Sequence, residues 1–237
     1  MTKPSLDAAS ALVEGGFAFL DAAGARAWLE SAGSLAGWDA LSSSWDGMAL
    51  DEFMADGGRY RRRRYAVFHT EGARIVREAH RPHYQTTDYN RLNGGVERWF
   101  EATPEEISSG DAFQTVLRAC HRLFGGLKLG RAWHIETHQF RIEARPGEAG
   151  QPTPEGSHRD GVDFVLVLMI RRENIRSGVT TIHAPDGARL GEFTLAHPLE
   201  AAIVDDRRVF HGVTAVEPID PAKPAHRDVF VATFRAM

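Results

Sequence analysis

The segment EGSHRDGVDFVLVLMI, residues 155–170, places a polar His-Arg-Asp tripeptide just before an apolar run. A short apolar run bounded by glycine and charged residues is typical of a buried β-strand, and this run is too short to span a bilayer. Residues two apart in extended chain point to the same side, so His158 and Asp160 project together while Arg159 points away. The segment therefore predicts a buried strand with two candidate metal ligands at its edge.

Further strand patterns surround this segment in the second half of the chain. Glycine, proline and aspartate separate them, and no helical pattern lies between them. The expected strands cover residues 133–144, 163–171, 179–184, 201–204, 209–216 and 228–234. Short strands joined by tight turns predict an antiparallel sandwich or open barrel, here a double-stranded β-helix, or jelly roll.

Helical periodicity dominates the first half of the chain. The clearest helix covers residues 111–124, where Asp111 can cap the N-terminus and a glycine pair ends the pattern. Weaker patterns predict helices at residues 22–32 and 95–107. The apolar faces of these helices need a partner, so we expect them to flank the sheet.

Composition supports one globular domain over residues 1–237, with 43% hydrophobic and 25% charged residues. We expect a mainly β fold with flanking helices (α+β). In this fold, residues 1–130 form a mostly helical buttress with substrate-pocket elements, and residues 131–237 form a jelly-roll catalytic core. The net charge of −4 argues against binding of nucleic acid through phosphates and favours a small-molecule substrate.

Cellular location and redox state are also indicated by the sequence. Asp7 and Glu14 stand where a signal peptide would need an apolar core, so we expect a cytoplasmic protein with no membrane partner. The single cysteine, Cys120, lies in an apolar helical stripe and is expected to be a buried thiol. No pattern indicates an oligomeric state.

A third candidate metal ligand, His211, follows Asp160 after 51 residues, at the end of another apolar segment. Two histidines and one carboxylate match the facial triad of non-heme Fe(II) oxygenases, which leaves coordination positions open for a bidentate cosubstrate and for dioxygen. A structural zinc site would have four ligands rich in thiolate. His-x-Asp is a common tripeptide, however, and its alternative interpretation is a surface loop without metal.

Arg227 strengthens the metal hypothesis, because it lies 16 residues after His211 at the start of the last expected strand. Its planar guanidinium can bind the distal carboxylate of a dicarboxylate that chelates the iron; the alternative is a surface ion pair. Arg235 has the same strand parity but lies about 26 Å further along. Gln139 and Arg141 are two apart on one strand, so we expect them either at the same cavity, binding cosubstrate, or on an exposed polar face.

Two other polar patterns receive a structural interpretation. His134, Glu136 and His138 alternate on one strand, where they form a row about 13 Å long that suits three ligands of one ion poorly. We interpret them as surface or packing residues. The basic run at residues 61–64 is expected to be a solvated edge-strand face, with alternation sending two arginines each way. The alternative is that an inward arginine binds a substrate carboxylate.

An ordered series of motifs resembles the Fe(II)/2-oxoglutarate dioxygenase family that includes bacterial hydroxylases of free isoleucine, leucine and methionine. The series consists of PTPEGSHRDGVDF (152–164), RENI (172–175), FHGVT (210–214) and RDV (227–229). The resemblance covers residues 140–234 most strongly. It implies a jelly-roll core with helical buttresses, in agreement with the strand pattern.

The same resemblance implies specific roles for the candidate residues. His158, Asp160 and His211 would be the iron ligands, and Arg227 would anchor 2-oxoglutarate. The expected cofactors are Fe(II), 2-oxoglutarate and O₂, and the expected reaction is hydroxylation of an unactivated C–H of a free aliphatic L-amino acid, with release of succinate and CO₂. A cupin-type or non-catalytic metal-binding protein with a regulatory role in stress or biofilm formation is the alternative, because a fold does not fix its chemistry.

Overall fold

The computed structural model describes residues 7–89, 92 and 94–237. The helices are α1 (Ala8–Gly15), α2 (Ala22–Glu30), α3 (Trp38–Ser43), α4 (Glu105–Ser108) and α5 (Asp111–Leu127). The strands are β1 (Phe17–Leu20), β2 (Arg61–Glu71), β3 (Arg74–Arg77), β4 (Glu101–Ala102), β5 (Trp133–Glu143), β6 (Phe164–Glu173), β7 (Ile175–Ser177), β8 (Val179–His183), β9 (Arg189–Thr194), β10 (Ala201–Asp205), β11 (Phe210–Val213), β12 (Val216–Pro218) and β13 (His226–Ala236).

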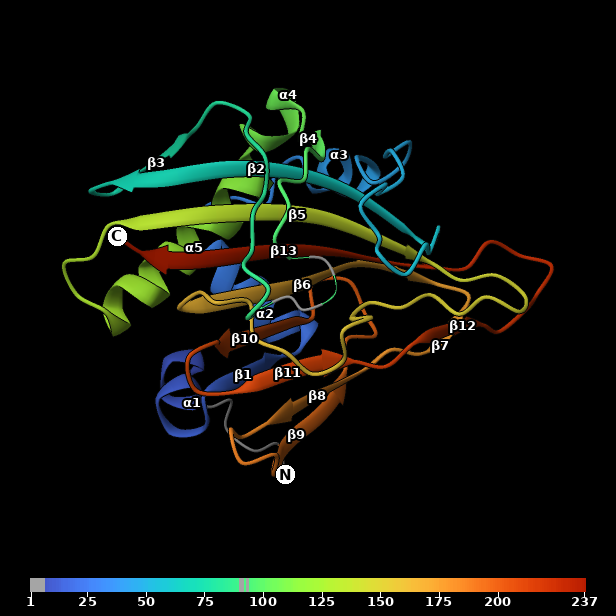
Figure 1. Cartoon of the computed structure of the whole chain (residues 1–237). Helices are drawn as coiled ribbons and strands as arrows, with labels where there is room; N and C mark the ends of the chain where they lie inside the picture. Colours follow the sequence, from blue (N-terminus) through green and yellow to red (C-terminus); the bar gives the residue numbers. More distant parts are fainter. Residues whose placement is uncertain (1–6, 90–91, 93) are drawn as a thin grey trace.

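Two sheets of unequal size form the jelly-roll core (Figure 1). The large sheet has the strand order β1-β10-β6-β13-β5-β2-β3, all antiparallel, with β4 added in parallel beside β2. The small sheet has the order β11-β8-β9, and β12 pairs with β7 at one end of the molecule. The predicted mainly β fold with a jelly-roll core is therefore confirmed.

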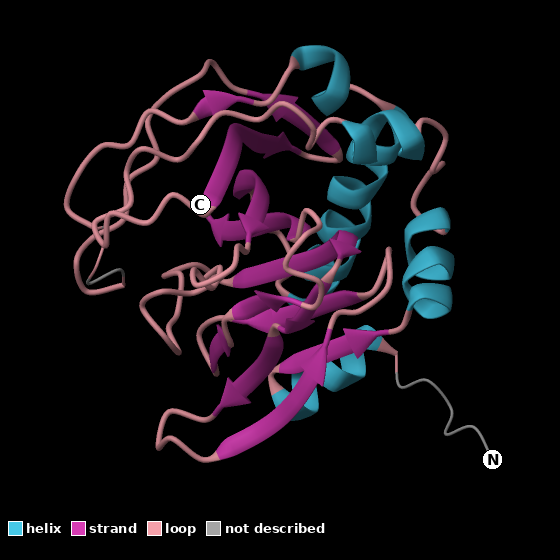
Figure 2. Ribbon diagram, turned by 90° about the vertical axis from the view of Figure 1, so that its right-hand side faces the viewer, coloured by secondary structure: helices cyan, strands magenta, loops and turns pink. Residues whose placement is uncertain are grey.

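The helices lie along one side of the large sheet, while long loops extend on the other side (Figure 2). Alternate residues of β5, β6 and β13 face these helices and form the main core with them. The strongest contact is aromatic: Phe124 of α5 stacks on Phe164 with ring centroids 4.5 Å apart and meets Phe234 edge-on at 5.0 Å. Because side chains alternate along a strand, the other residues of these strands face the loops.

Most expected elements are present, with small shifts of their ends. The strands expected in the second half correspond to β5, β6, β8, β10, β11 and β13. The long helix begins at Asp111 as expected, but Gly110 occupies the N-cap position and the glycine pair lies inside the helix, which continues to Leu127. Cys120 is fully buried in this helix, as predicted.

The first half of the chain departs most from expectation, because it is less helical than its periodicity indicates. It contributes β2, a long strand inside the large sheet, together with β1, β3 and β4. The helix expected at residues 95–107 is wrong; that stretch contains only β4 and the beginning of α4. Tertiary pairing overrides the local pattern of that stretch, because Arg98 bridges to His83 and Glu101–Ala102 pair with β2.

The basic run at residues 61–64 is not an edge-strand face. Arg61 to Arg64 pair with β5 on one side, and β4 and the bridge from Leu50 to Arg62 cover the other side. The expected alternation does hold: Arg61 and Arg63 are buried, and Arg62 and Arg64 point to the opposite side of the strand. No helix in the described ranges has both the length and the apolar character needed to cross a membrane.

Candidate active site

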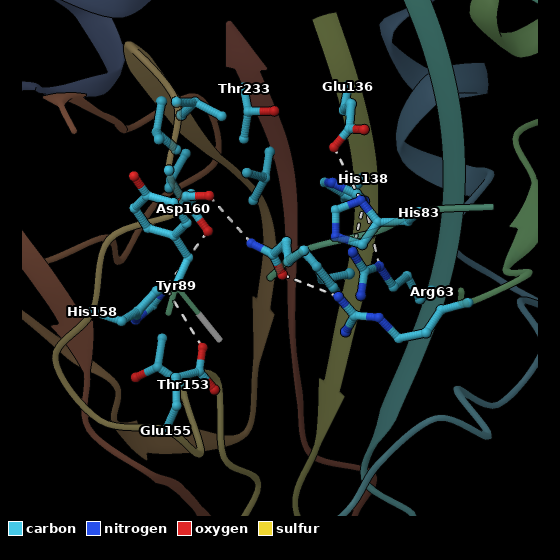
Figure 3. A pocket seen from close by; sticks show the side chains of 18 of the residues that line it. Arg63, His83, Tyr89, Glu136, His138, Thr153, Glu155, His158, Asp160 and Thr233 are labelled. Carbon is cyan, nitrogen blue, oxygen red and sulfur yellow. Dashed lines mark hydrogen bonds and ion pairs between the residues drawn. The ribbon is translucent and has the colours of Figure 1, made fainter. Parts of the chain in front are cut away.

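A cavity of about 690 Å³ lies on the loop side of the large sheet. One wall, here called the ligand wall, carries His158 and Asp160 from the loop before β6 and His211 from β11. The opposite wall, here called the sheet wall, consists of inward side chains of β2, β5 and β13. Figure 3 shows the two walls facing each other, with His158 and Asp160 on one side and Arg63 and His138 on the other.

The three predicted metal ligands converge at the ligand wall. The His158 and His211 backbones form two reciprocal hydrogen bonds of 2.9 and 3.0 Å, which hold the loop against β11. His158 Nε2 lies 3.7 Å from Asp160 Oδ1, and His211 Nε2 lies 3.6 Å from Asp160 Oδ2. Two atoms that each lie about 2.1 Å from one ion are at most roughly 4.2 Å apart. Both measured distances therefore fit a single metal ion between the three side chains.

Neighbouring groups orient this ligand set. The Gly156 carbonyl oxygen lies 3.1 Å from His158 Nδ1, so an Nδ1–H donor leaves Nε2 as the nitrogen that faces Asp160. Gly156 and Gly161, on either side of the motif, have φ values of +81° and +80°, which side chains rarely tolerate. This explains why glycine flanks the motif on both sides.

Asp206 fixes the loop that carries His158 and Asp160 by accepting hydrogen bonds from three backbone N–H groups. Its carboxylate accepts hydrogen bonds from the backbone nitrogens of Asp160 at 2.9 Å, Gly161 at 2.8 Å and Val162 at 3.1 Å. Asp206 is 1% exposed, and burial together with the charge of Asp160 raises its pKa to about 6. The turn after the metal-binding motif is thus fixed by a residue that the sequence analysis did not single out.

The protonation states of the ligand set follow from burial and mutual charge. Burial and the charge of His158 lower the pKa of His211 to about 4, so its ring is neutral at pH 7. Burial opposes protonation of His158, but the Asp160 and Glu155 carboxylates outweigh it and raise the His158 pKa to about 9. Partial burial would raise the pKa of Asp160, yet the histidines outweigh it and lower this pKa to about 2. Metal binding would therefore displace a proton from His158.

Arg227 lies inside the cavity, as the sequence predicted. It is 2% exposed, at the start of β13, and its Nε and Nη2 atoms have no hydrogen-bond partner among the described residues. Arg235 also lines the cavity but is exposed at the other end of the strand. A buried guanidinium with two unused donors is suited to bidentate binding of a ligand carboxylate.

Gln139 and Arg141 do not face the cavity, which corrects their expected role as cofactor-binding residues. Gln139 donates a hydrogen bond to Ser44 Oγ at 2.7 Å, and Arg141 binds Asp228 and Asp46 at 2.7 and 2.8 Å. The cavity is lined instead by the even-numbered residues of β5. Gln139 and Arg141 do share one side of β5, as predicted, but this side faces the helices rather than the cavity. There Arg141 forms ion pairs with Asp46 and Asp228.

The row on β5 that was interpreted as surface or packing is buried at the cavity. His138 is 4% exposed, and Glu136 accepts hydrogen bonds from Tyr65 at 2.7 Å and pairs with His83 Nδ1 at 3.0 Å. His83, Glu136 and His138 bring their ligand atoms within 4.8 Å of one another, which makes them a second geometric candidate for a metal. Burial, and then the Arg63 guanidinium, lower the pKa of His138.

This second group is a poor metal site despite its geometry. Arg63 Nη2 lies 3.0 Å from His138 Nδ1, so a positive charge already sits beside the donor atoms. Glu136 Oε1 already accepts a hydrogen bond from the Tyr65 hydroxyl, and Oε2 pairs directly with His83 Nδ1. The packing interpretation of the row therefore holds, and the surface interpretation is wrong.

Sequence reasoning missed several cavity residues because they come from segments without clear periodicity. His83, Gln85 and Arg98 lie in the stretch between β3 and β4, and Glu155 precedes the metal-binding motif. Gln85 connects the walls, since it donates to the Asp160 carbonyl oxygen at 3.4 Å and accepts from Arg98 at 3.0 Å. The only sequence signal for this group was the concentration of charge around the aromatic residues of that stretch.

The chain is similar to one curated relative with a defined reaction. It is 27% identical over 157 residues to a 3(1)-hydroxy-L-isoleucine 4-dioxygenase of Pantoea ananatis, and the match covers 65% of this chain and 64% of the relative. The chain thus spans just under two thirds of the length of that enzyme.

Solved structures extend the similarity over nearly the whole chain. A bsmA homologue from Methylobium petroleophilum superposes with a TM-score of 0.88 at 39% identity, covering 96% of this chain and 91% of the other. IDO from Bacillus thuringiensis shares the fold, with a TM-score of 0.75 at 16% identity and coverage of 97% and 98%.

The family model described as "2OG-Fe dioxygenase" matches residues 42–233, which include the three ligand-wall residues and Arg227. The family uses Fe(II), 2-oxoglutarate and O₂, and the donor set of two histidine nitrogens and one carboxylate suits Fe(II). The chain therefore belongs to the 2OG-Fe dioxygenase family of oxidoreductases.

Proposed function

We propose that this dioxygenase hydroxylates an unactivated C–H bond of a free aliphatic L-amino acid. The balanced reaction converts substrate, O₂ and 2-oxoglutarate into hydroxylated substrate, succinate and CO₂. His158, Asp160 and His211 would hold the iron, and Arg227 would bind the distal carboxylate of 2-oxoglutarate. The observation that carries this proposal is the convergence of the ligand triad and a buried arginine with two unused donors on one cavity.

The chain's own part in the reaction is binding and orientation. Bound Fe(II) would supply the oxidising chemistry together with 2-oxoglutarate and O₂. Asp206 would keep Asp160 in place through the loop backbone, and Arg227 would fix the cosubstrate relative to the ligand triad. Aliphatic side chains that line the cavity, among them Val165 and Val167 of β6 and Val231 of β13, would keep water from the reacting groups.

The substrate class is supported by the relative's name and by the size of the cavity. The Pantoea ananatis enzyme is named for a reaction on a hydroxylated isoleucine, at 27% identity to this chain. A volume of about 690 Å³ accommodates 2-oxoglutarate together with a second small molecule. The cavity is also lined by both charged and aliphatic residues, which matches an amino acid with an apolar side chain.

Anaerobic addition of Fe(II) and then 2-oxoglutarate, followed by absorption spectroscopy, tests the site. We expect a metal-to-ligand charge-transfer band that is absent in His158→Ala and requires much higher 2-oxoglutarate in Arg227→Met. Arg235→Met is the matched control on the same strand and should retain the band. Absence of the band in the wild-type protein would refute the proposed site.

Turnover tests the substrate class. The iron-loaded protein should release succinate and a hydroxylated product when supplied with O₂, 2-oxoglutarate and L-isoleucine, L-leucine or L-methionine. Product is measured by mass spectrometry, and succinate without amino acid gives the uncoupled background. A normal charge-transfer band with no product from the proteinogenic amino acids would leave the cofactor site intact and refute the substrate class.

A further inference from the structure

The sheet wall and the adjoining segment between β3 and β4 carry a cluster of three buried guanidinium groups, those of Arg61 and Arg63 on β2 and that of Arg98. Their residues are 6%, 5% and 1% exposed, and all three line the cavity. Arg63 and Arg98 meet at the ring of Phe100, whose centroid lies 3.8 Å from the Arg63 Cζ atom and 5.6 Å from that of Arg98. The cluster is therefore one continuous positive surface inside the cavity.

Direct ion pairing reaches only one member of the cluster, although the Asp51, Glu155 and Glu136 carboxylates favour the charged form of Arg98 from a distance. Arg61 forms a buried ion pair with Asp51 at 2.7 Å. Arg63 instead contacts the neutral ring of His138 and the faces of Phe100 and Phe140. Within the described ranges, no carboxylate forms an ion pair with Arg63 or Arg98, although both are buried. A buried charge without a counter-ion is costly, so the pair is suited to an anionic ligand.

The strand register separates this cluster from the proposed 2-oxoglutarate anchor. Arg61, Ile142 and Arg227 lie in one row across β2, β5 and β13, and Arg63, Phe140 and Val229 lie in the next row. Strands are about 4.8 Å apart, so the backbones of Arg61 and Arg227 are roughly 10 Å apart with an apolar residue between them. Burial and the Arg172 guanidinium lower the pKa of Arg227, with no contribution from Arg61, Arg63 or Arg98, which agrees with two separate anion positions in the cavity.

The cluster is also connected to the ligand wall. Gln85 accepts a hydrogen bond from Arg98 at 3.0 Å and donates one to the Asp160 carbonyl oxygen at 3.4 Å. One side chain thus spans the space between the arginine pair and the backbone of the iron-binding motif. A small ligand held by Arg63 and Arg98 would therefore have its remaining atoms beside the ligand wall.

We infer that Arg63 and Arg98 bind the carboxylate of the substrate, with Arg61 kept in place by Asp51 beside them. This inference rests on the proposed function and specifies its substrate as a small aliphatic carboxylate. Nε and Nη2 of Arg63 contact His138 Nδ1, so Arg63 would donate to the carboxylate from Nη1, while its faces rest on Phe100 and Phe140. Arg98 would donate from Nε, which has no hydrogen-bond partner among the described residues. The aliphatic part of the substrate then extends along the valines of the wall toward the iron ligands.

Comparison of amino acids with their amides tests this inference without any variant. Under nitrogen, the protein loaded with Fe(II) and 2-oxoglutarate is titrated with L-leucine, L-isoleucine or L-methionine, and with the matching amides, by calorimetry. We expect at least one acid to bind roughly 30-fold or more tightly than its amide, because a charge-assisted pair of hydrogen bonds is lost. Equal affinities, or no binding by any acid while the charge-transfer band forms, would overturn the inference and leave the cofactor site standing.

Variants then assign the effect to the arginine pair. Arg63→Met and Arg98→Met should each remove most of the acid-over-amide preference and leave the charge-transfer band unchanged. Arg63→Lys, which keeps the charge but not the planar fork, should retain part of the preference. Arg62→Met is the matched control, since Arg62 is the next residue on the same strand and binds Glu143 on the other side. Full preference in a folded Arg63→Met protein would contradict the assignment, and absence of the band in the wild type would overturn the proposed function itself.

Discussion

The two walls of the cavity are built in different ways. The ligand wall takes its three side chains from a loop motif and a four-residue strand, and backbone hydrogen bonds hold them together. The sheet wall takes its side chains from three strands of 11 residues each, where register alone brings Arg61, Ile142 and Arg227 into one row. A compact motif therefore determines the metal chemistry, while long-range strand pairing determines what lies opposite the metal.

Replacing one carboxylate on each wall should give the largest difference in Fe(II) binding between two variants. Asp160→Ala should weaken Fe(II) binding by more than about 100-fold, because it deletes a proposed ligand. Glu136→Gln should leave one bound iron per chain, since Glu136 is engaged by Tyr65 and His83 rather than by a metal. Iron content after anaerobic loading and desalting measures both. Loss of iron in Glu136→Gln alone would reverse the assignment of the two walls.

Loosening the ligand loop without touching a ligand should have a smaller effect. Asp206→Asn replaces an acceptor of three backbone N–H groups by an amide, and we expect Fe(II) affinity to fall about 10- to 100-fold. Asp205→Asn, at the neighbouring position, is the control. An anaerobic Fe(II) titration compares the two variants. Wild-type affinity in Asp206→Asn would show that the motif keeps its shape unaided.

Acidification should destabilise the metal-free protein through buried His211, whose pKa is lowered. The unfolded chain takes up a proton on His211 near pH 6.5, but the folded protein does so only near its pKa of about 4, so stability falls as the pH falls between these values. The full difference corresponds to about 3 kcal/mol. His158 has a raised pKa of about 9; its contribution is complete below pH 6.5 and is lost only as the pH rises toward 9.

Urea unfolding at pH 7 and pH 5 measures this loss of stability. The difference in unfolding free energy between pH 7 and pH 5 should be smaller in His211→Asn than in the wild type. It should stay the same in His197→Asn, which changes an exposed histidine on the outside of the molecule. An equal pH dependence in the wild type and His211→Asn would mean that His211 is not held neutral by burial.

The smallest effect on ligand binding is expected on the helix side of β5. Arg141→Met should change the affinity for 2-oxoglutarate by less than about twofold, because Arg141 points away from the cavity. Stability should fall by about 1–3 kcal/mol, since buried Asp228 keeps Arg171 as its one arginine partner among the described residues. The 2-oxoglutarate titration and urea unfolding separate the two effects. Weak 2-oxoglutarate binding by a stable Arg141→Met protein would restore the role first expected for this residue.

The ligand wall could be predicted from the sequence better than the wall opposite it, for a physical reason. The triad and Arg227 could be singled out because their residue types are specific to metal and carboxylate binding and because strand parity relates neighbours in sequence. The same parity argument grouped Gln139 with Arg141 correctly but could not choose their side of the sheet, since a one-residue change of orientation reverses inside and outside. His83 was missed because its segment has no strand or helix pattern, and Arg98 was missed because a weak helical pattern over residues 95–107 predicted a helix there.

By itself, the sequence determined the jelly-roll core, the family resemblance and the placement of His158 and Asp160 on one side of the chain, whereas His211 reaches them through its long-range bridge to His158. Local patterns decide these features, because alternation specifies strands and a short motif supplies adjacent ligands. Only the tertiary structure decided that β2 lies inside the large sheet, that Arg61 and Arg63 point inward, and that Arg98 joins them. Those positions depend on pairing between strands far apart in the chain, and that pairing is not encoded in any one segment.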